Sequence, residues 1–588
     1  MTLGEKSIAL DGATQKNVDQ WLNGHYDAET KATIQRLLKD NPKEIVDAFY
    51  THLSFGTAGM RGIMGVGTNR MNQYTIRAAT QALASYLNQV PAPKNGHAVF
   101  IGYDSRHNSE FFAEEAAKVL AANGIKTYLC PELRPTPFVS FGCRYKHCSS
   151  AIMITASHNP AEYNGYKVYW NDGGQILPPH DKNIMDAFDA ITDVKAVKKL
   201  DTLIHPLIEM VTQEIDEAYL KAIEVLQSYP EDNLTHGEKL KVVYTSLHGT
   251  GITLMPRAMA EWGFTNLEYV APQIIPDGAF PTVKKPNPED PQALTMGIEV
   301  LKKSHGDLLV ATDPDADRVA VAVSHKGDVQ LLNGNQVACL CLEHICKALN
   351  DRQALPKKAT CIKSIVTTEM YKVIAASYHC ECVDVLPGFK YIAEKIREWE
   401  KDPQGNIFIF GAEESYGYLL GTQARDKDAI LAGVLICEMA LQAKLKGKTL
   451  IDCMEDLYKK YGVYFEEVQS LNFEESKSGK EQMVSTMDRL RKSPPKQLAG
   501  SPVRVLDDYE TLTKTELSSG KTAKINMPKS NILIYWLEDG SKVIVRPSGT
   551  EPKIKIYCGV VHVLNGQLPK VLQECQQHAA QILKDVGK

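Results

Sequence analysis

The segment DLLVATDPDADR at residues 307–318 contains the pattern that decides the fold, a short apolar run followed at once by a polar loop. The same pattern recurs in AVFIGYDSR (98–106), AIMITASHNP (151–160), KVVYTSLHGTG (241–251) and NIFIFGAEESYG (406–417). Short apolar runs that alternate with helix-like stretches are typical of βαβ units. The sequence therefore predicts an α/β fold with mainly parallel sheets, in which these polar loops follow the carboxyl ends of the strands, where ligands bind.

The chain is long enough for several hydrophobic cores. Its 588 residues, of which 44% are hydrophobic and 23% charged, correspond to about three to five domains. After residue 448 the apolar runs become longer and alternate, which indicates a smaller C-terminal α+β domain. We divide the chain into four domains with the boundaries 1–205, 206–325, 326–445 and 446–588.

Composition excludes several classes of partner. The net charge of -5 provides no broad positive field for nucleic acid. The longest apolar stretch, residues 429–437, is shorter than the roughly 20 residues of a membrane-spanning helix, and the N-terminus resembles no targeting peptide. We expect a cytoplasmic protein whose 13 cysteines are reduced and mostly buried rather than metal-bound.

The loop TASHNP at residues 155–160 contains a candidate phosphoryl acceptor. Ser157 has His158 and Asn159 beside it, and Lys167 follows ten residues later. A serine in a sharp turn accepts a phosphoryl group when a cation and a proton acceptor are close. The alternative is a structural turn in which Ser157 and Asn159 bind the local backbone.

Three carboxylates occupy alternate positions in the loop of residues 312–318. Asp313, Asp315 and Asp317 would repel one another without a cation, and oxygen ligands favour Mg²⁺. The loop lacks the glycine and the closing glutamate of an EF-hand. A solvated acidic turn remains an alternative, as does an enzyme in which Asp313 is itself the phosphoryl nucleophile.

Three further loops contain polar or basic residues that could bind a ligand. RPSGTEPK at residues 546–553 combines cations, hydroxyls and a glycine that can bind a phosphate dianion. AEESYGY (412–418) offers carboxylates and a hydroxyl for sugar hydroxyls, and FGTAGMRG (55–62) presents Arg61. The alternatives are a plain hairpin turn for RPSGTEPK, an exposed acidic loop for AEESYGY and a tight turn for FGTAGMRG. The chain contains no P-loop and no strand-borne GxGxxG, so nothing supports nucleotide-dependent transfer.

Taken in order, FGTAGMRG, TASHNP, DPDADR, AEESYGY and RPSGTEPK resemble the α-D-phosphohexomutase superfamily over nearly the whole chain. The length and the segment LPGFKY (386–391) are similar to its longer phosphoglucomutase branch, which also includes phosphopentomutases and a glucose-1,6-bisphosphate synthase. The resemblance implies three related mixed α/β-sheet domains plus a C-terminal α+β domain of the TATA-binding-protein-like type, all around a central cleft.

The resemblance also implies roles for individual residues. Ser157 would carry the phosphate and, with Asp313, Asp315 and Asp317, would bind Mg²⁺. The other residues with implied roles would surround the transferring phosphoryl group or bind the sugar and the phosphate that does not react: Arg61, His158, Lys167, Arg318, Lys390, Glu413, Ser415, Lys427, Arg546, Ser548, Gly549 and Thr550.

The activity implied by the resemblance is the interconversion of glucose 1-phosphate and glucose 6-phosphate through glucose 1,6-bisphosphate, with mannose phosphates as further substrates. Phosphopentomutase and bisphosphate synthase remain alternatives within the superfamily. An Asp-nucleophile phosphatase and a non-catalytic phosphosugar-binding protein remain alternatives outside it. Some relatives have a histidine shortly after the sugar loop, whereas GYLLGTQA (417–424) has none. The proton acceptor therefore stays open among Lys167, His158 and Lys427, and we expect a monomer or weak dimer.

Overall fold

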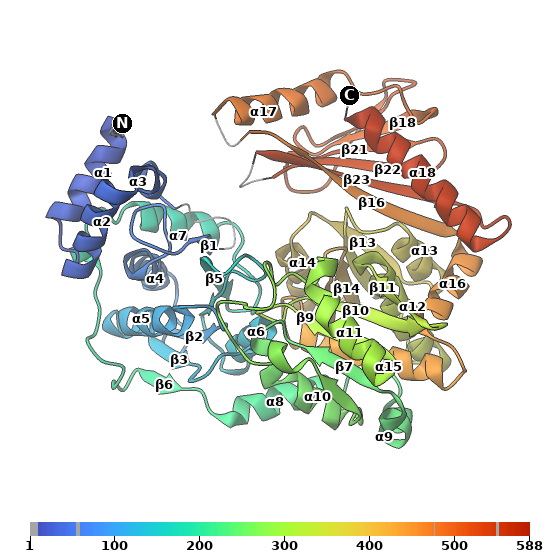
Figure 1. Ribbon diagram of the computed structural model, residues 1–588, viewed down its shortest axis with the longest axis horizontal. Helices are drawn as coiled ribbons and strands as arrows, with labels where there is room; N and C mark the ends of the chain where they lie inside the picture. Colours follow the sequence, from blue (N-terminus) through green and yellow to red (C-terminus); the bar gives the residue numbers. More distant parts are fainter. Residues whose placement is uncertain (1–9, 54–58, 475–476, 549–551, 588) are drawn as a thin grey trace, which may run out of the picture. The chain divides into compact units, whose positions relative to one another are not determined.

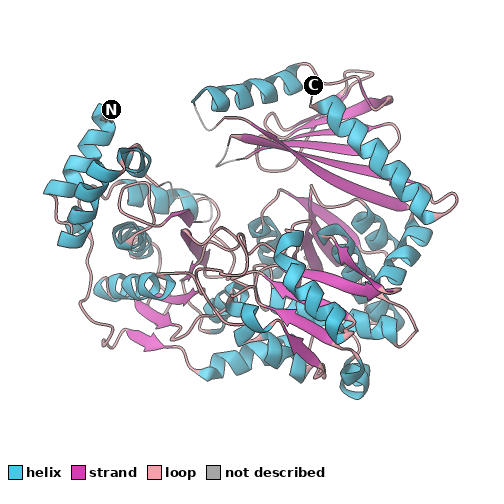
Figure 2. Ribbon diagram, in the orientation of Figure 1, coloured by secondary structure: helices cyan, strands magenta, loops and turns pink. Residues whose placement is uncertain are grey.

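The described residues form four β-sheets with flanking helices, as the computed structural model shows (Figure 1). The structure describes residues 10–53, 59–474, 477–548 and 552–587. Three sheets alternate with helices along the chain, and the fourth is an antiparallel sheet near the C-terminus (Figure 2). The predicted fold class of three mixed α/β-sheet domains followed by an α+β domain is confirmed.

Three capped helices precede the first sheet. They are α1 (Gly12–Asn23), α2 (Ala28–Asp40) and α3 (Pro42–Phe49). The side chains of Asp11, Asp27 and Asn41 accept hydrogen bonds from backbone N–H groups in the first turns, which would otherwise lack partners. The apolar faces of these helices pack around the buried Trp21, so this region has a small core of its own.

The first sheet has the strand order β1-β5-β4-β2-β3-β6. Its elements are β1 (Gly59–Ile63), α4 (Gln73–Leu87), β2 (Ala98–Tyr103), α5 (Ser109–Ala122), β3 (Lys126–Leu129), α6 (Thr136–Tyr145), β4 (Ser150–Ile154), β5 (Tyr163–Trp170), α7 (His180–Asp189) and β6 (Ile208–Met210). Strands β2, β3, β4 and β6 are parallel, and β5 is antiparallel to β1 and β4. The loops after β2 and β4 therefore leave the same edge of the sheet.

The second sheet has the order β11-β10-β9-β7-β8. Its region contains α8 (Gln213–Glu224), α9 (Pro230–His236), β7 (Val242–Thr245), α10 (Met255–Glu261), β8 (Leu267–Tyr269), α11 (Thr295–Ser304), β9 (Leu308–Thr312), β10 (Val319–His325) and β11 (Asp328–Leu332). The antiparallel strands β9 and β10 pair Thr312 with Val319. Residues 313–318 are therefore the tight connection between two buried strands.

In the third sheet β12 runs parallel to both β13 and β14. The elements of this region are α12 (Gly334–Asp351), β12 (Ala359–Ser364), α13 (Met370–Ser377), β13 (Glu381–Val385), α14 (Phe389–Lys401), β14 (Ile407–Glu413), β15 (Gly417–Leu420), α15 (Ala429–Lys444) and α16 (Leu450–Tyr461). Strand β14 ends at Glu413, so the carboxylate of the AEESYGY segment lies at the carboxyl end of a parallel strand.

The C-terminal sheet has the order β16-β23-β22-β21-β18-β19-β20. Its region comprises β16 (Val463–Asn472), α17 (Lys477–Lys492), β17 (Gln497–Leu498), β18 (Ser501–Asp508), β19 (Thr513–Glu516), β20 (Thr522–Lys524), β21 (Leu533–Leu537), β22 (Lys542–Pro547), β23 (Lys553–His562) and α18 (Leu568–Val586). Neighbouring strands are antiparallel, and α18 lies along the strands β16 and β23 (Figure 2).

The chain forms two compact units that are interleaved along the sequence. The first comprises residues 1–331, 393–403 and 417–441, and the second comprises 332–392, 404–416 and 442–588. The four domain boundaries inferred from composition stay a prediction.

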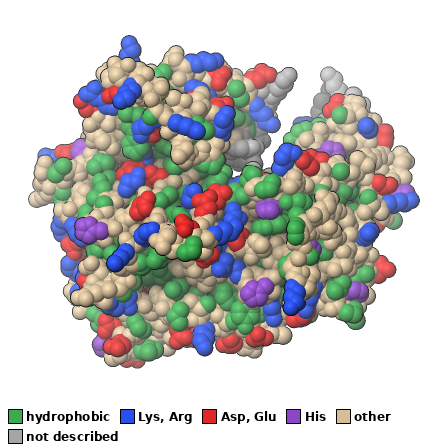
Figure 3. Space-filling view, turned by 180° about the vertical axis from the view of Figure 1, so that it is seen from behind, with side chains coloured by type: hydrophobic (Ala, Val, Ile, Leu, Met, Phe, Trp, Pro, Cys, Tyr) green, Lys and Arg blue, Asp and Glu red, His purple; other side chains and the backbone are tan. Residues whose placement is uncertain are grey.

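The surface and the cysteines agree with the composition. On the face seen in Figure 3, Lys and Arg side chains lie among Asp and Glu side chains. All 13 cysteines lack disulfide partners and most are buried, which confirms the predicted burial. Among the helices that the structure describes, none combines the length and the apolar character needed to cross a bilayer.

Candidate active site

Ser157 lies in the loop that follows β4, and its side chain is directed at the acidic loop. The residue is buried and has a φ of 53°, in the left-handed region. Its Oγ donates a hydrogen bond to Asp313 Oδ2 at 2.9 Å and lies 3.1 Å from Nδ1 of His158. The Ser157 N–H donates to Thr155 Oγ1 at 2.8 Å. The structure therefore brings together the two motifs that sequence analysis selected independently.

Asp313, Asp315 and Asp317 converge in the β9–β10 connection. Each offers a carboxylate oxygen, and these atoms lie within 4.8 Å of one another. Asp313 Oδ1 accepts hydrogen bonds from the N–H groups of Asp317 and Arg318, both at 3.0 Å. Oδ1 of Asp315 and Oδ1 of Asp317 are buried without hydrogen-bond partners. Buried, unsatisfied carboxylate oxygens fit a bound metal ion, so this loop is a candidate metal site.

The three carboxylates differ in electrostatic environment. Burial and the charges of Asp315 and Asp317 raise the pKa of Asp313 well above its usual value. Burial also opposes ionisation of Asp315, but the Lys167 ammonium outweighs it and lowers the Asp315 pKa below its usual range. Without a metal ion, burial and repulsion among the three carboxylates therefore make Asp313 the hardest of them to ionise.

Two lysines neutralise the acidic loop. Lys167, on β5, donates to Asp315 Oδ2 at 2.7 Å and to Asp317 Oδ2 at 3.2 Å. Lys427 contacts Asp317 Oδ2 and Asp426 Oδ1, each at 3.1 Å. Burial opposes the charge of Lys167, but Asp315 and Asp317 raise its pKa above the usual value. Both amines therefore contact carboxylates.

Three further basic side chains predicted for the site lie around Ser157 and the acidic loop. Arg61, on β1, donates from Nη1 to Asn159 Oδ1 at 2.8 Å. Arg318 forms an ion pair with Glu289 and lies 3.9 Å from Asp317. Burial, with the charges of Arg318 and Arg61, lowers the pKa of His158 well below its usual value. His158 is therefore neutral near pH 7.

Sequence analysis did not identify two groups that orient these side chains. Thr136, the first residue of α6, donates from Oγ1 to Asp315 Oδ2 at 2.8 Å. Asp426 accepts from the Tyr169 hydroxyl at 2.9 Å and from Gln175 Nε2 at 3.0 Å, in addition to Lys427. Neither Thr136 nor Asp426 lies in a phosphate or acidic motif, although Asp426 directly precedes a predicted lysine.

The residues predicted to bind sugar hydroxyls belong to the second unit. Glu413 is buried at the end of β14, and its Oε1 accepts the N–H of Gly388 at 2.7 Å. This bond joins the AEESYGY segment to LPGFKY. Lys390, in the first turn of α14, has its Nζ 5.2 Å from the centre of the Tyr391 ring. Ser415 is partly exposed beyond the strand.

The predicted phosphate loop joins β22 and β23 in the same unit. Arg546 stands opposite Lys555 in the antiparallel register, which places two cations side by side. The N–H of Ser548 donates to the carbonyl of Lys553 at 2.8 Å. Gly549 and Thr550, also predicted for this site, lie outside the described residues.

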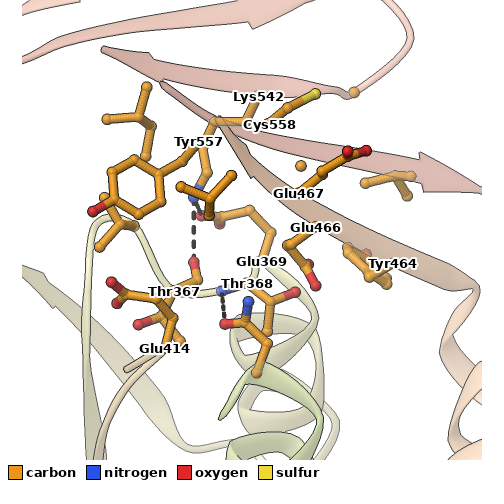
Figure 4. A pocket seen from close by; sticks show the side chains of 17 residues that line it. Thr367, Thr368, Glu369, Glu414, Tyr464, Glu466, Glu467, Lys542, Tyr557 and Cys558 are labelled. Carbon is orange, nitrogen blue, oxygen red and sulfur yellow. Dashed lines mark hydrogen bonds and ion pairs between the residues drawn. The ribbon is translucent and has the colours of Figure 1, made fainter. Parts of the chain in front are cut away.

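A buried lysine fastens the C-terminal sheet to the loop after β12 (Figure 4). Lys542 Nζ donates to the carbonyls of Ile365 at 2.9 Å and Thr367 at 3.3 Å, and pairs with Glu369 Oε1 at 2.6 Å. Burial and the nearby charge of Lys363 lower the pKa of Lys542 to about 8. The adjoining cavity of about 30 Å³ has room for a water molecule or two, so the joint is structural.

Comparison with known proteins agrees with this geometry. Residues 52–195, 217–327 and 333–461 match the descriptions "Phosphoglucomutase/phosphomannomutase, alpha/beta/alpha domain I", "domain II" and "domain III" respectively. The chain is 38% identical to a phosphoglucomutase of Staphylococcus aureus (strain bovine RF122 / ET3-1), covering 87% of this chain and 90% of the relative. Identity to a phosphoglucomutase of Staphylococcus epidermidis is 37%, covering 88% and 92%.

Solved structures share the fold. The phosphoglucomutase pp63/parafusin of Paramecium gives a TM-score of 0.68 at 17% identity and covers 91% of this chain and 95% of that chain. A phosphoglucomutase/phosphomannomutase family protein of Burkholderia thailandensis gives 0.65 at 18% identity and covers 91% and 98%. From the sequence identity to curated relatives, from the three domain matches and from the shared fold, the chain belongs to the phosphoglucomutase/phosphomannomutase enzymes of the α-D-phosphohexomutase superfamily.

Proposed function

We propose that this enzyme is a phosphoglucomutase that interconverts glucose 1-phosphate and glucose 6-phosphate through a phosphoserine at Ser157 and glucose 1,6-bisphosphate. The observation that carries the proposal is the 2.9 Å hydrogen bond from Ser157 Oγ to Asp313, one of three converging carboxylates. Relatives named phosphoglucomutase at 37–38% identity support the same activity.

Mg²⁺ is the metal ion that we propose for the acidic loop. Asp313, Asp315 and Asp317 would hold it, and their all-oxygen donor set suits a hard cation. When bound, the ion supplies positive charge beside the phosphoryl oxygens. The phosphate on Ser157 would add a further oxygen ligand.

The basic residues near Ser157 would stabilise the charge of the transferring phosphoryl group. Phosphoryl transfer depends mainly on positioning and on neutralisation of charge. Lys167, Lys427, Arg61 and Arg318 provide cations in the same unit as Ser157. His158 Nδ1 is within hydrogen-bond distance of Ser157 Oγ, whereas both lysines donate to carboxylates. We propose His158 as the group that exchanges a proton with the serine, whose hydroxyl would turn from Asp313 to Nδ1 for that step.

Residues of the second unit would recognise the sugar and the phosphate that does not react. We propose that Glu413 and Ser415 bind sugar hydroxyls and that Lys390 binds the same substrate beside them. Arg546, Ser548, Gly549 and Thr550 would bind the distant phosphate in either orientation of the bisphosphate, since both phosphates have the same charge and shape.

The competing hydrolase interpretation makes Asp313 the nucleophile. Peptide mass spectrometry after reaction with glucose 1,6-bisphosphate separates the two chemistries. We expect acid-stable phosphate on Ser157, and Ser157→Ala should remove nearly all turnover. A hydroxylamine-labile aspartyl phosphate would refute the mutase proposal. Binding of glucose 1-phosphate without turnover, in the presence of Mg²⁺ and a trace of the bisphosphate, would instead indicate a non-catalytic binding protein.

Substrate choice is tested by measuring kcat/KM for glucose 1-phosphate, mannose 1-phosphate and ribose 1-phosphate side by side. A single hydroxyl contact discriminates by about 1–3 kcal/mol, so mannose phosphates should be tolerated. We expect the kcat/KM for glucose 1-phosphate to exceed the kcat/KM for ribose 1-phosphate. A pentose preference of about tenfold or more would favour phosphopentomutase, and net formation of the bisphosphate from an external phosphoryl donor would favour the synthase.

A further inference from the structure

Arg106 lies at the centre of the loop that carries Ser157. This arginine follows β2, and its Nη1 donates to the carbonyls of Pro160 at 2.7 Å and Tyr163 at 3.0 Å. Its Nη2 donates to the carbonyl of Ser157 at 2.6 Å and to that of Asn159. A single guanidinium thus binds four backbone carbonyls between residues 157 and 163.

The arginine is held in place from its other sides. Its side chain is fully buried, as is that of Asp104, and Arg106 Nε lies 3.3 Å from Asp104 Oδ2. Asp104 Oδ1 accepts from the Arg106 N–H at 3.0 Å and from Ser109 Oγ at 2.7 Å. The ring of Phe280 covers the guanidinium, with its centre 4.9 Å from Cζ. The group is therefore preorganised and has little freedom to move.

The Ser157 loop has a conformation that needs such support. Ser157 has a φ of 53°, which residues other than glycine rarely adopt. The carbonyls of this turn converge, and buried carbonyls without donors are costly. A planar guanidinium presents up to five N–H groups in a fixed fork, whereas an ammonium has three donors on one atom. Lysine therefore cannot reproduce the contacts of Arg106.

We propose that Arg106 is a positioning residue that holds the Ser157 backbone so that Oγ stays aligned with Asp313, an inference that rests on the proposed function of Ser157. The argument is geometric. The Ser157 carbonyl binds Arg106, while the Oγ of the same residue lies 2.9 Å from Asp313 Oδ2. Displacement of a reacting group by about 1 Å can cost about 100-fold in rate.

The test compares Arg106→Lys and Arg106→Met with Arg70→Met. Arg70 is a matched control, because it is equally buried in the same unit and its ion-pair partners, Glu44 at 2.8 Å and Asp47 at 2.6 Å, lie outside residues 155–165. We measure single-turnover phosphorylation of Ser157 by glucose 1,6-bisphosphate, steady-state kcat and KM for glucose 1-phosphate, and Tm.

Both Arg106 variants should lower the single-turnover rate and kcat about 100-fold while KM changes by less than about threefold. The Arg70 variant should lower Tm and leave both rates near wild type. If Arg106→Lys phosphorylates Ser157 at the wild-type rate, the positioning role is overturned. Arg106→Lys keeps the test decisive if Arg106→Met fails to fold.

Hydrogen exchange of the peptide covering residues 155–165 separates this inference from the proposed function. Exchange should rise at least about tenfold in Arg106→Lys and stay unchanged in Arg70→Met. Unchanged protection in Arg106→Lys would overturn the positioning role. Absence of phosphate on wild-type Ser157 would refute the proposed function instead, and the exchange measurement would still decide whether Arg106 holds the loop.

Discussion

Removing the Thr136 hydroxyl should weaken metal binding without removing a metal ligand. Thr136 donates to Asp315 Oδ2 at 2.8 Å, and the same oxygen accepts from Lys167 at 2.7 Å. In Thr136→Val the side chain keeps its shape but loses its donor, so the Asp315 carboxylate is free to turn toward Lys167 and is more easily protonated. A hydrogen bond to a charged group contributes about 1.5–3 kcal/mol. Because Lys167 remains, we expect the lower part of that range.

This free energy corresponds to a rise of about tenfold in the Mg²⁺ dissociation constant. Loss of a group that orients a metal ligand typically weakens metal binding by about 10- to 100-fold, so the expected rise is at the lower end of that range. The assay is calorimetric titration with Mg²⁺, together with the Mg²⁺ dependence of kcat. Thr136→Ser keeps the donor and should bind like wild type. Thr80→Val removes another buried hydroxyl, 2.8 Å from the Ile76 carbonyl, and controls for stability alone. An unchanged or tighter Mg²⁺ affinity in Thr136→Val would refute the reasoning.

Three further predictions test other residues. Asp313→Asn should lower Mg²⁺ affinity and leave Tm nearly unchanged, because the side-chain oxygen still accepts the two backbone N–H groups. Calorimetric titration measures the affinity, and melting curves measure Tm. Arg546→Ala should raise KM for glucose, mannose and ribose 1-phosphates by similar factors, since it would bind the phosphate they share, and unequal factors would contradict that role. Burial raises the pKa of Glu466 to about 7, above the ordinary 4.5. The contribution of Glu466 to wild-type stability therefore falls as pH rises from about 4.5 to 7, and Glu466→Gln should gain Tm relative to wild type between pH 5 and pH 8.

The strands and the chemistry of the main loops could be predicted because both are local in sequence. The run before Asp313 is apolar and β9 is wholly buried, and the run before Ser157 corresponds to β4. Carboxylates at alternate positions predict a cation site without any knowledge of the fold. The contact between Ser157 and Asp313 could be predicted only from the family resemblance or seen in the structure, because 156 positions separate the two residues.

The orienting residues could not be predicted because their roles depend on long-range packing. Thr136 and Asp315 are 179 positions apart, and a threonine at a helix N-terminus has no distinguishing local pattern. Asp426 acquires its role only when Tyr169 approaches it. Arg106 gave a detectable signal, since GYDSR ends a buried strand with an acid and a base, but its four carbonyl partners appear only in the folded loop.

The interleaving of the two units limits how this gene can be shortened or recombined. A product ending at residue 331 would keep Ser157 and the three aspartates but lose the stretch 417–441 that belongs to the same unit. Tyr219 would lose Asp428, which accepts its hydroxyl at 2.8 Å, and Asp317 would lose Lys427. A single crossover between residues 318 and 427 of homologous genes would likewise join one parent's acidic loop to the other parent's lysine. The unit that holds Ser157 and the acidic loop is therefore not a separable N-terminal module, because it includes stretches of chain beyond residue 331.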